Sequence, residues 1–144
     1  MFKPTLSIIT IVYNNVRDIE YTLLSVLEQR YAPIEYIVVD GNSNDGTMDV
    51  IRRYADNIDI LISEPDQGIY DAMNKGIRLA KGDYLCFLNA GDAFYAPDTL
   101  QTIVDTIAGE SELPHVLYGE TAEVDDERNF VRMRRLKAPE NLNW

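Results

Sequence analysis

The segment Tyr84–Leu88 is apolar, and it is followed directly by a turn-like stretch with Asn89, Gly91 and the carboxylate of Asp92. This composition predicts a buried strand followed by a turn. In α/β sheets, ligands bind beyond the carboxyl ends of the strands. A carboxylate at such a position can hold a divalent cation against a phosphate group. The segment therefore indicates a metal-assisted phosphate site at Asp92.

Two earlier segments have the same design. The apolar run Leu6–Val12 leads into Tyr13 and Asn14, and Tyr36–Val39 leads into Asp40. Because the carboxyl ends of parallel strands lie along one edge of a sheet, we expect these polar residues and Asp92 to share one pocket. Asp40 could accept hydrogen bonds from a base or a ribose in that pocket.

Apolar runs and helical periodicities alternate along the chain, and this alternation predicts the elements that position the pocket. The expected strands are Leu6–Val12, Glu35–Val39, Ile58–Ile62 and Asp83–Leu88, and the expected helices cover Val16–Leu27, about Met48–Ala55, Ile69–Ala80 and Pro97–Ile107. The β/α order predicts an α/β fold with a mainly parallel sheet, right-handed crossovers and helices on both faces.

The character of the chain changes after Pro114. Val116–Val124 and Phe130–Leu136 predict two antiparallel strands, and Ala138–Trp144 has no obvious packing partner. A length of 144 residues suits one domain with a hydrophobic core. We expect residues 1–112 to form the βα ligand-binding core, and residues 113–144 to form a hairpin and an unanchored tail.

The charge of the chain narrows the classes of partner. A formal net charge of −11 argues against a nucleic-acid partner, since phosphate backbones require clustered Lys and Arg. An acidic protein can still bind an anionic nucleotide if a metal ion and backbone amides offset the repulsion. The charge is therefore compatible with a small nucleotide ligand.

Cysteine content and hydropathy indicate the compartment. The single cysteine, Cys86, cannot form an internal disulfide and is expected to be an inert thiol in a strand. No signal peptide is visible, and no apolar run approaches the roughly 20 residues of a membrane helix. A cytoplasmic location without a membrane span is the simplest expectation.

The loop after the first strand excludes several nucleotide sites. Tyr13–Arg17 contains no glycine, which excludes both a G-x-G-x-x-G dinucleotide fingerprint and a Walker phosphate loop at this position. No acidic pair follows the first strand, which argues against a receiver-type phosphorylation site. What remains is a nucleotide site without a glycine cradle, in which a metal ion near Asp92 would neutralise a diphosphate.

Four motifs in order carry a family resemblance. They are Ser7-Ile-Ile-Thr-Ile-Val-Tyr-Asn14, Val38-Val-Asp-Gly-Asn-Ser-Asn-Asp-Gly-Thr47, Asn74-Lys-Gly76 and Phe87-Leu-Asn-Ala-Gly-Asp92. Together they resemble glycosyltransferase family 2, whose members have the GT-A fold and transfer sugars from nucleotide-diphosphate donors. The resemblance implies a Rossmann-like sheet of the GT-A type and a UDP- or GDP-sugar donor. It runs in register to Asp92 and more loosely to Glu120.

The resemblance also implies roles for individual residues. The implied nucleotide-binding residues are Thr10, Val12, Asn14, Asp40, Asp45, Gly68, Asn74, Asn89, Ala90, Gly91 and Asp92. Of these, Asp40 would bind the base, Asp45 would shape the adjoining loop with Thr47, and Asp92 would hold Mg²⁺ or Mn²⁺. The segment Gly68–Lys75 would approach the ribose and the diphosphate.

The chain departs from the family pattern in three ways. Asn89 and Gly91 replace the first acids of the D-x-D-like motif, and Met73 stands where many relatives have an Arg. The catalytic base of the family lies further along a usually longer chain, and nothing after Glu120 matches it. The catalytic residue is therefore unknown, and this chain resembles a donor-binding domain that continues into a missing acceptor half.

The resulting hypothesis is a glycosyltransferase donor domain of polysaccharide biosynthesis. It would bind the donor through a divalent metal and transfer a hexose to a glycan or lipid-linked acceptor, with inversion. The alternatives are a non-catalytic nucleotide-sugar-binding or interaction module and a nucleotidyltransferase. The nucleotidyltransferase is disfavoured because that class usually has a glycine-rich, basic loop after its first strand, and Tyr13–Arg17 lacks one. Some residues also have structural interpretations, with Asp40 as a turn residue, Asp45 as a helix cap and Gly76 as a packing position.

Overall fold

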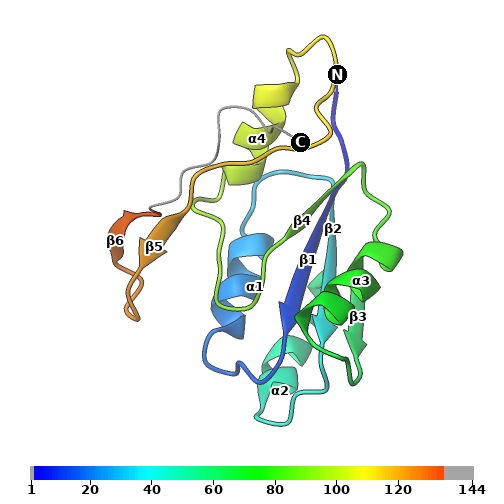
Figure 1. Ribbon diagram of the computed structural model, residues 1–144, viewed down its shortest axis with the longest axis vertical. Helices are drawn as coiled ribbons and strands as arrows, with labels where there is room; N and C mark the ends of the chain where they lie inside the picture. The colour runs from blue at the N-terminus through cyan, green and yellow to red at the C-terminus, as the bar shows by residue number, and fades with distance from the viewer. Residues whose placement is uncertain (1, 135–144) are drawn as a thin grey trace. The chain divides into compact units, whose positions relative to one another are not determined.

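The computed structural model describes residues 2–134 and divides the chain into two compact units, Met1–Ala108 and Gly109–Trp144. The expected boundary at residues 112 and 113 lies just inside the second unit. The first unit contains a four-stranded sheet and the second a two-stranded sheet (Figure 1).

The first unit is an alternating β/α structure. Its strands are β1 (Leu6–Val12), β2 (Ile34–Asp40), β3 (Ile60–Ser63) and β4 (Tyr84–Phe87), and its α-helices are α1 (Ile19–Leu27), α2 (Thr47–Arg52), α3 (Ile69–Leu79) and α4 (Thr99–Ile107). All strand pairs in this sheet are parallel, in the order β3-β2-β1-β4. These elements confirm the predicted mixed α/β class with a parallel sheet.

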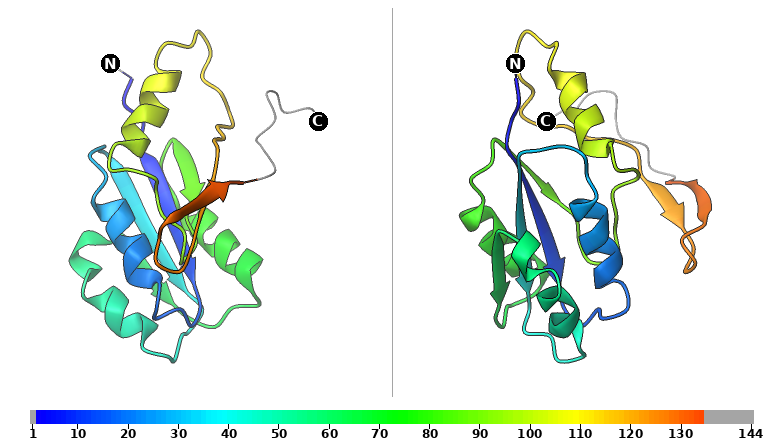
Figure 2. Two further views of the ribbon diagram at one scale, coloured as in Figure 1. Left: turned by 90° about the vertical axis from the view of Figure 1, so that its left-hand side faces the viewer. Right: turned by 180° about the vertical axis from the view of Figure 1, so that it is seen from behind.

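The strand order places a topological switch between β1 and β4. The chain adds β2 and β3 on one side of β1 and then returns to add β4 on the other side. The helices α1 and α2 pack on one face of the sheet and α3 on the other (Figure 2). Crevices at the carboxyl ends of the strands on either side of such a switch are where α/β proteins bind ligands.

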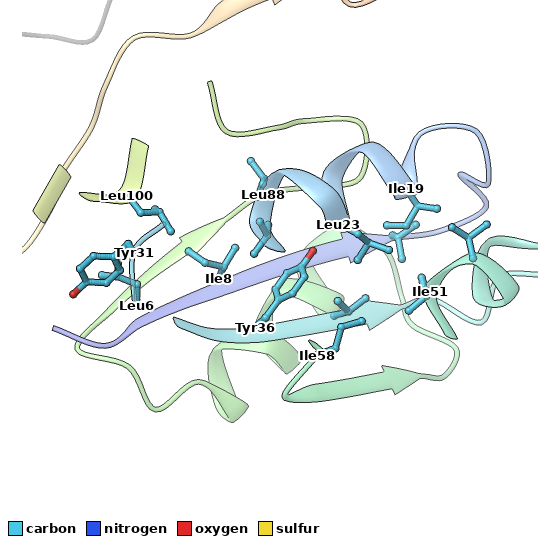
Figure 3. Close-up of a cluster of buried hydrophobic side chains, with 14 of the residues drawn as sticks. Leu6, Ile8, Ile19, Leu23, Tyr31, Tyr36, Ile51, Ile58, Leu88 and Leu100 are labelled. Atoms are coloured by element: carbon cyan, nitrogen blue, oxygen red, sulfur yellow. The ribbon is translucent and has the colours of Figure 1, made fainter. Parts of the chain in front are cut away.

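The face that carries α1, α2 and α4 has the larger hydrophobic core. Ile8 and Tyr36 from the sheet are buried there together with Leu23 from α1 and Ile51 from α2 (Figure 3). Apolar residues at helical spacing in α1 explain why that helix forms against the sheet. Within residues 2–134, no helix is both long and apolar enough to cross a membrane.

The opposite face is covered closely by α3. Ile9 and Ile37 are fully buried beneath the helix, beside Ala72. A Cβ atom placed on Gly76 would lie 2.5 Å from Cγ2 of Ile9, well inside van der Waals contact. The packing alternative for Gly76 therefore has direct support, because this glycine lets the helix approach the sheet.

We expect Gly76→Ala to destabilise the protein by up to about 2 kcal/mol. The added methyl group overpacks against the buried Ile9 at a cost of about 1–3 kcal/mol, which outweighs a helix-propensity gain of about 1 kcal/mol. Gly109→Ala is the matched control, since no atom lies within 4 Å of a Cβ at that position. Denaturant unfolding measures both, and equal stability of the two variants would contradict the close approach.

A carboxylate at the start of β2 joins three segments of the first unit. The Ser7 hydroxyl and the Lys81 N–H both donate to Glu35 Oε2, and the Gly82 N–H donates to Ser7 Oγ at 2.9 Å. Partial burial raises the pKa of Glu35. The hydrogen bonds lower that pKa by more, so that it lies below its ordinary value of 4.5.

The depressed pKa of Glu35 predicts a pH-dependent contribution to stability. A group whose pKa is lower in the folded state stabilises the fold above its unfolded pKa, and this contribution is lost as the pH falls through the folded pKa. Glu35→Gln should therefore lower the unfolding temperature at neutral pH, and the difference from wild type should vanish as the pH falls below 4.5. The exposed Glu28→Gln serves as the control. A difference that persists unchanged at low pH would rule out the ionised carboxylate as its source.

Several element boundaries differ from the prediction. α4 begins at Thr99 and not at Pro97, because Asp98 occupies the N-cap position and Thr99 Oγ1 accepts the Ala96 N–H at 2.9 Å. α2 ends at Arg52 and is followed by the 3₁₀ helix η1 (Ala55–Asn57). The Ile58 N–H then donates to Ala55 O in this turn, so β3 begins later than predicted.

The second unit contains the predicted antiparallel pair in a shorter form. β5 covers Ala122–Val124 and β6 covers Phe130–Met133. The prediction of a strand over residues 116–121 is wrong, because β6 pairs only with residues 122–124. Asp125 shapes the turn by accepting the N–H groups of Glu127 and Asn129. Leu136 and the predicted tail lie outside the described residues.

Candidate nucleotide-binding site

The first unit has a pocket of about 350 Å³ at the carboxyl ends of its strands. This volume is within the range of roughly 300–1,000 Å³ that is usual for small-molecule sites. The lining residues come from the ends of β1 and β4 and from the segment between β3 and α3, and they are Ile11, Val12, Tyr13, Asn15, Asp66, Gly68, Ile69, Asn89 and Ala90. The pocket thus combines both strands of the topological switch.

The turn after β4 is held by α1. Gly91 has a φ of 102°, which a glycine adopts without strain, and its N–H donates to Thr22 Oγ1 at 2.9 Å. The same Thr22 hydroxyl donates to Asp92 O at 2.7 Å. Thr22 is fully buried in α1, so it fixes the turn that presents the exposed Asp92. Sequence reasoning did not single out Thr22, because a lone Thr in a helix has no distinctive signal.

Asn89 contributes an unusual atom to the pocket lining. Its Oδ1 is buried and has no hydrogen-bond partner within the described residues. Buried polar atoms are normally satisfied, so an unpaired acceptor beside a pocket indicates a ligand-binding position. Asn89 and Asp92 both offer hard oxygen atoms, which fit Mg²⁺ or Mn²⁺.

The described residues do not form a complete metal cage. Among residues 2–134, no group of three or more His, Cys, Asp or Glu side chains is placed to hold a metal ion. Mg²⁺ commonly keeps several water ligands and takes others from substrate phosphates. Asp92 and Asn89 therefore suit a cation that arrives with a phosphorylated ligand.

Asp40 lies at the end of β2 but does not line the pocket. Its side chain is fully buried, and its carboxylate accepts hydrogen bonds from the Ser43 N–H at 3.0 Å, from the Ser43 hydroxyl and from the Ser63 hydroxyl at 2.6 Å. This arrangement matches the structural alternative, in which Asp40 organises a turn. The carboxylate joins the loop after β2 to the end of β3.

The loop beyond Asp40 is tied to the loop after β1. Asn14 has a φ of 46°, and its Oδ1 accepts the Asn44 N–H at 2.9 Å. Asp45 Oδ2 accepts the Val16 N–H at 3.1 Å, and Asp45 Oδ1 accepts the Thr47 hydroxyl. The hydrogen bond from Thr47 is the main reason why the pKa of Asp45 lies below its usual value. Asn14 and Asp45 thus shape the rim of the pocket without lining it.

Two other expected site residues lie away from the pocket. Thr10 is fully buried beneath α1, with its Oγ1 3.0 Å from the hydroxyl of Tyr36. Burial raises the pKa of that tyrosine. Asn74 is exposed on α3. Lys75, which follows it, donates to Glu64 at 2.9 Å and to Pro65 O at 2.9 Å.

The pocket also contains residues that the sequence analysis did not assign to it. These are Ile11, Asn15 and Asp66. A signal for Asp66 was present, since this carboxylate comes shortly after the end of β3. Of the predicted residues, the pocket brings together Val12, Tyr13, Gly68, Ile69, Asn89 and Ala90.

Comparisons with known proteins agree on one family. The family model described as Glycosyl transferase family 2 matches residues 7–141. An uncharacterized glycosyltransferase of Mycobacterium tuberculosis is 42% identical over 108 residues, which are 74% of this chain and 41% of the relative. A PGL/p-HBAD biosynthesis glycosyltransferase of Mycobacterium bovis is 38% identical over 123 residues, which are 83% of this chain and 48% of the relative. The chain thus spans less than half the length of these relatives.

A solved structure supports the same assignment. The mannosyltransferase PcManGT from Pyrobaculum calidifontis, in complex with GDP-Man and Mn²⁺, matches with a TM-score of 0.68 and 31% sequence identity. The match covers 75% of this chain and 33% of the mannosyltransferase. The parallel sheet of the first unit therefore has the architecture of a GT-A glycosyltransferase.

Proposed function

Because the chain belongs to glycosyltransferase family 2, we propose that its pocket binds the nucleotide part of a nucleotide-diphospho-sugar donor. The observation that carries this proposal is the buried, unpaired Asn89 Oδ1 in a pocket at the switch between β1 and β4. The donor would be a UDP- or GDP-sugar. The similar mannosyltransferase, which was solved with GDP-Man and Mn²⁺, supports a donor and a divalent ion of this kind.

The diphosphate would lie between Asp92 and the start of α3. The first N–H groups of a helix have no partner within that helix, and they favour anions. Gly68, whose φ is 112°, and Ile69 bring this helix end to the pocket. Asp92 and Asn89 would hold Mg²⁺ or Mn²⁺, which when bound neutralises the diphosphate as it leaves.

The other residues of the chain would position the nucleoside. Ile11, Val12 and Ala90 provide apolar surface that excludes water from the ligand. Asn14 and Asp45 would hold the loops around the pocket through their hydrogen bonds. Thr10 would stabilise β1 through its hydrogen bond with the Tyr36 hydroxyl. In this proposal Asn74 and Gly91 also act indirectly, by supporting the elements that carry lining residues.

The transfer step itself needs a group that we do not assign. A carboxylate must remove the proton of the acceptor hydroxyl as that hydroxyl attacks the anomeric carbon. We propose that this base, together with the site for a glycan or lipid-linked acceptor, belongs to sequence beyond the donor-binding core. Transfer of a hexose with inversion in polysaccharide biosynthesis remains a prediction. So does a cytoplasmic location, which the unpaired Cys86 favours.

Calorimetric titration of the 144-residue chain tests the proposal. GDP and UDP should bind in the presence of Mn²⁺, and chelation of the metal should weaken binding by about 10-fold or more, since the ion neutralises part of the diphosphate charge. Adenosine without phosphates serves as the negative control. If neither nucleotide bound at millimolar concentration with Mn²⁺, the proposed function would be wrong for this chain.

A second candidate function is a non-catalytic nucleotide-sugar-binding or interaction module. Such a module would need the donor pocket but no catalytic base, and no base is assigned among residues 2–134. The two functions differ in turnover. Release of sugar from GDP-mannose or UDP-N-acetylglucosamine would support the transferase, whereas tight donor binding without release or transfer would support the module.

A further inference from the structure

The segment after β4 is held by hydrogen bonds from one side of α1. Thr22 and Ser25 lie three residues apart on that side, and with Gln29, just beyond the end of the helix, they form a polar row. The Thr22 hydroxyl accepts the Gly91 N–H at 2.9 Å and donates to Asp92 O at 2.7 Å. A helical threonine commonly donates to a carbonyl one turn earlier, so this hydroxyl is used to hold another segment.

The other two members of the polar row bind the same segment further along. Ser25 Oγ accepts the Phe94 N–H at 3.3 Å. Gln29 Nε2 donates to Ala96 O at 2.7 Å, and Gln29 Oε1 accepts the Leu100 N–H at 3.1 Å. The polar row therefore binds backbone groups from the turn after β4 to the first turn of α4.

The backbone of the turn after β4 is fixed, whereas two of its side chains face a ligand or solvent. The Ala90 N–H donates to Ile11 O at 3.0 Å, and the Asp92 N–H donates to Asn89 O at 2.9 Å. Asn89 Oδ1 is buried in the pocket lining without a partner among residues 2–134, and Asp92 is exposed. The turn thus presents two hard oxygen ligands from a backbone that is already ordered.

We infer that Thr22 is a positioning residue for the metal ion, an inference that rests on the proposed function. The turn has a single carboxylate, because Asn89 and Gly91 stand where the family pattern has acids. With so few protein ligands, the affinity for a cation depends strongly on how much freedom Asp92 loses when the cation binds. Because Thr22 fixes the backbone of Asp92 before the metal arrives, that loss of freedom is smaller. The Thr22 hydroxyl acts on the metal only through this turn.

Two substitutions of Thr22 test the inference. Thr22→Val keeps the shape of the side chain but loses the hydroxyl, whereas Thr22→Ser keeps the hydroxyl. Electron paramagnetic resonance gives the concentration of free Mn²⁺ in titrations with GDP or UDP. Groups that orient metal ligands commonly contribute about 10- to 100-fold to metal affinity, so we expect Thr22→Val to bind Mn²⁺ with nucleotide about 10-fold more weakly than wild type. Thr22→Ser should bind it as wild type does.

The other members of the polar row separate positioning from stability. Gln29→Met, like Thr22→Val, removes hydrogen bonds to two backbone groups of the segment, but these groups lie further from Asp92. Gln29→Met should therefore lower the unfolding midpoint in denaturant about as much and weaken Mn²⁺ binding much less. Ser25→Ala is a milder variant, since Ser25 is only partly buried, and its loss of Mn²⁺ affinity should fall between the other two.

A measurement without metal or nucleotide reports on the turn itself. The amide hydrogen of Gly91 should exchange with solvent faster in Thr22→Val than in wild type or in Thr22→Ser, because the hydroxyl that accepts it is absent. Thr106→Val is the matched control for loss of a helical hydroxyl. Thr106 is exposed on α4 and donates to Thr102 O at 2.8 Å, so its replacement should change neither this exchange nor the binding of Mn²⁺.

The outcomes separate the role of Thr22 from the proposed function. If folded Thr22→Val took up Mn²⁺ as well as wild type, or if Gln29→Met lost as much affinity as Thr22→Val, the positioning role would be wrong while the metal site stood. If Thr22→Val did not fold, equal Mn²⁺ affinities of Ser25→Ala and Gln29→Met would overturn the inference. If wild type took up no Mn²⁺ with either nucleotide, the proposed function itself would fail.

Discussion

Replacement of Asp92 by Asn is expected to abolish the effect of Mn²⁺ on nucleotide binding. Asp92 is the exposed carboxylate in the turn after β4. The Thr22 hydroxyl holds this turn in place through hydrogen bonds with the backbone of Gly91 and Asp92. A neutral amide at this position is a much weaker ligand for a hard cation. Because a metal ion stabilises a departing diphosphate by several kcal/mol, any donor cleavage should fall by about 100-fold or more.

Paramagnetic measurements separate loss of the metal from loss of the nucleotide. Free Mn²⁺ is counted by electron paramagnetic resonance while GDP or UDP is added to wild type, to Asp92→Asn and to Asp105→Asn. Asp105 is an exposed carboxylate on α4 that accepts a hydrogen bond from Gln101, so its replacement leaves the pocket intact. The metal assignment would be abandoned if Asp92→Asn took up Mn²⁺ with nucleotide as well as wild type does.

Replacement of Asp40 by Ala is expected to destabilise the fold by about 3 kcal/mol. The substitution removes a buried carboxylate and leaves the Ser43 N–H and the Ser43 and Ser63 hydroxyls without their acceptor. Hydrogen bonds to charged groups contribute about 1.5–3 kcal/mol each, and rearrangement of the loop recovers part of the sum. Denaturant unfolding measures this loss, and nucleotide affinity should fall with the fraction of folded protein.

Ser63→Ala is the matched comparison for Asp40. It removes a single hydroxyl that donates to Asp40, and because Ser63 is exposed we expect a loss at the low end of the range for hydrogen bonds to charged groups, about 1.5 kcal/mol. The two variants together decide whether Asp40 is structural. A normal unfolding midpoint for Asp40→Ala, combined with a large loss of nucleotide affinity, would instead place the carboxylate at the base, as the family resemblance implies.

The pattern of the sequence alone predicted the parallel sheet. β1 was predicted with its bounds, because Leu6–Val12 is an almost unbroken apolar run and every residue of the strand is buried. α3 was predicted within one residue, since its apolar positions recur at helical spacing. Family membership also followed from the sequence, and the match over residues 7–141 confirms it.

The helix and strand boundaries that were predicted wrongly depend on contacts between residues that are distant in the sequence. The prediction placed Pro97 inside α4, but the turn around Asp98 and the hydrogen bond between Arg30 N–H and Pro97 O keep that proline outside the helix. β5 is shorter than the predicted strand Val116–Val124 because a strand exists only where a partner strand pairs with it. Pairing is a property of the folded chain and has no local signal.

The sequence determined which strand ends carry polar groups, and only the tertiary structure decided which of those groups reach the pocket. Asp40, the last residue of β2, and Asp66, after β3, carry the same carboxylate group, yet Asp40 is fully buried in a hydrogen-bonded turn and Asp66 lines the pocket. The difference arises in the loops, since the turn after β2 brings Ser43 back onto the Asp40 carboxylate, whereas the segment after β3 places Asp66 in the pocket lining. Strand periodicity sets the direction of side chains within a strand, but beyond its end that direction depends on turn geometry and on which loops pack together.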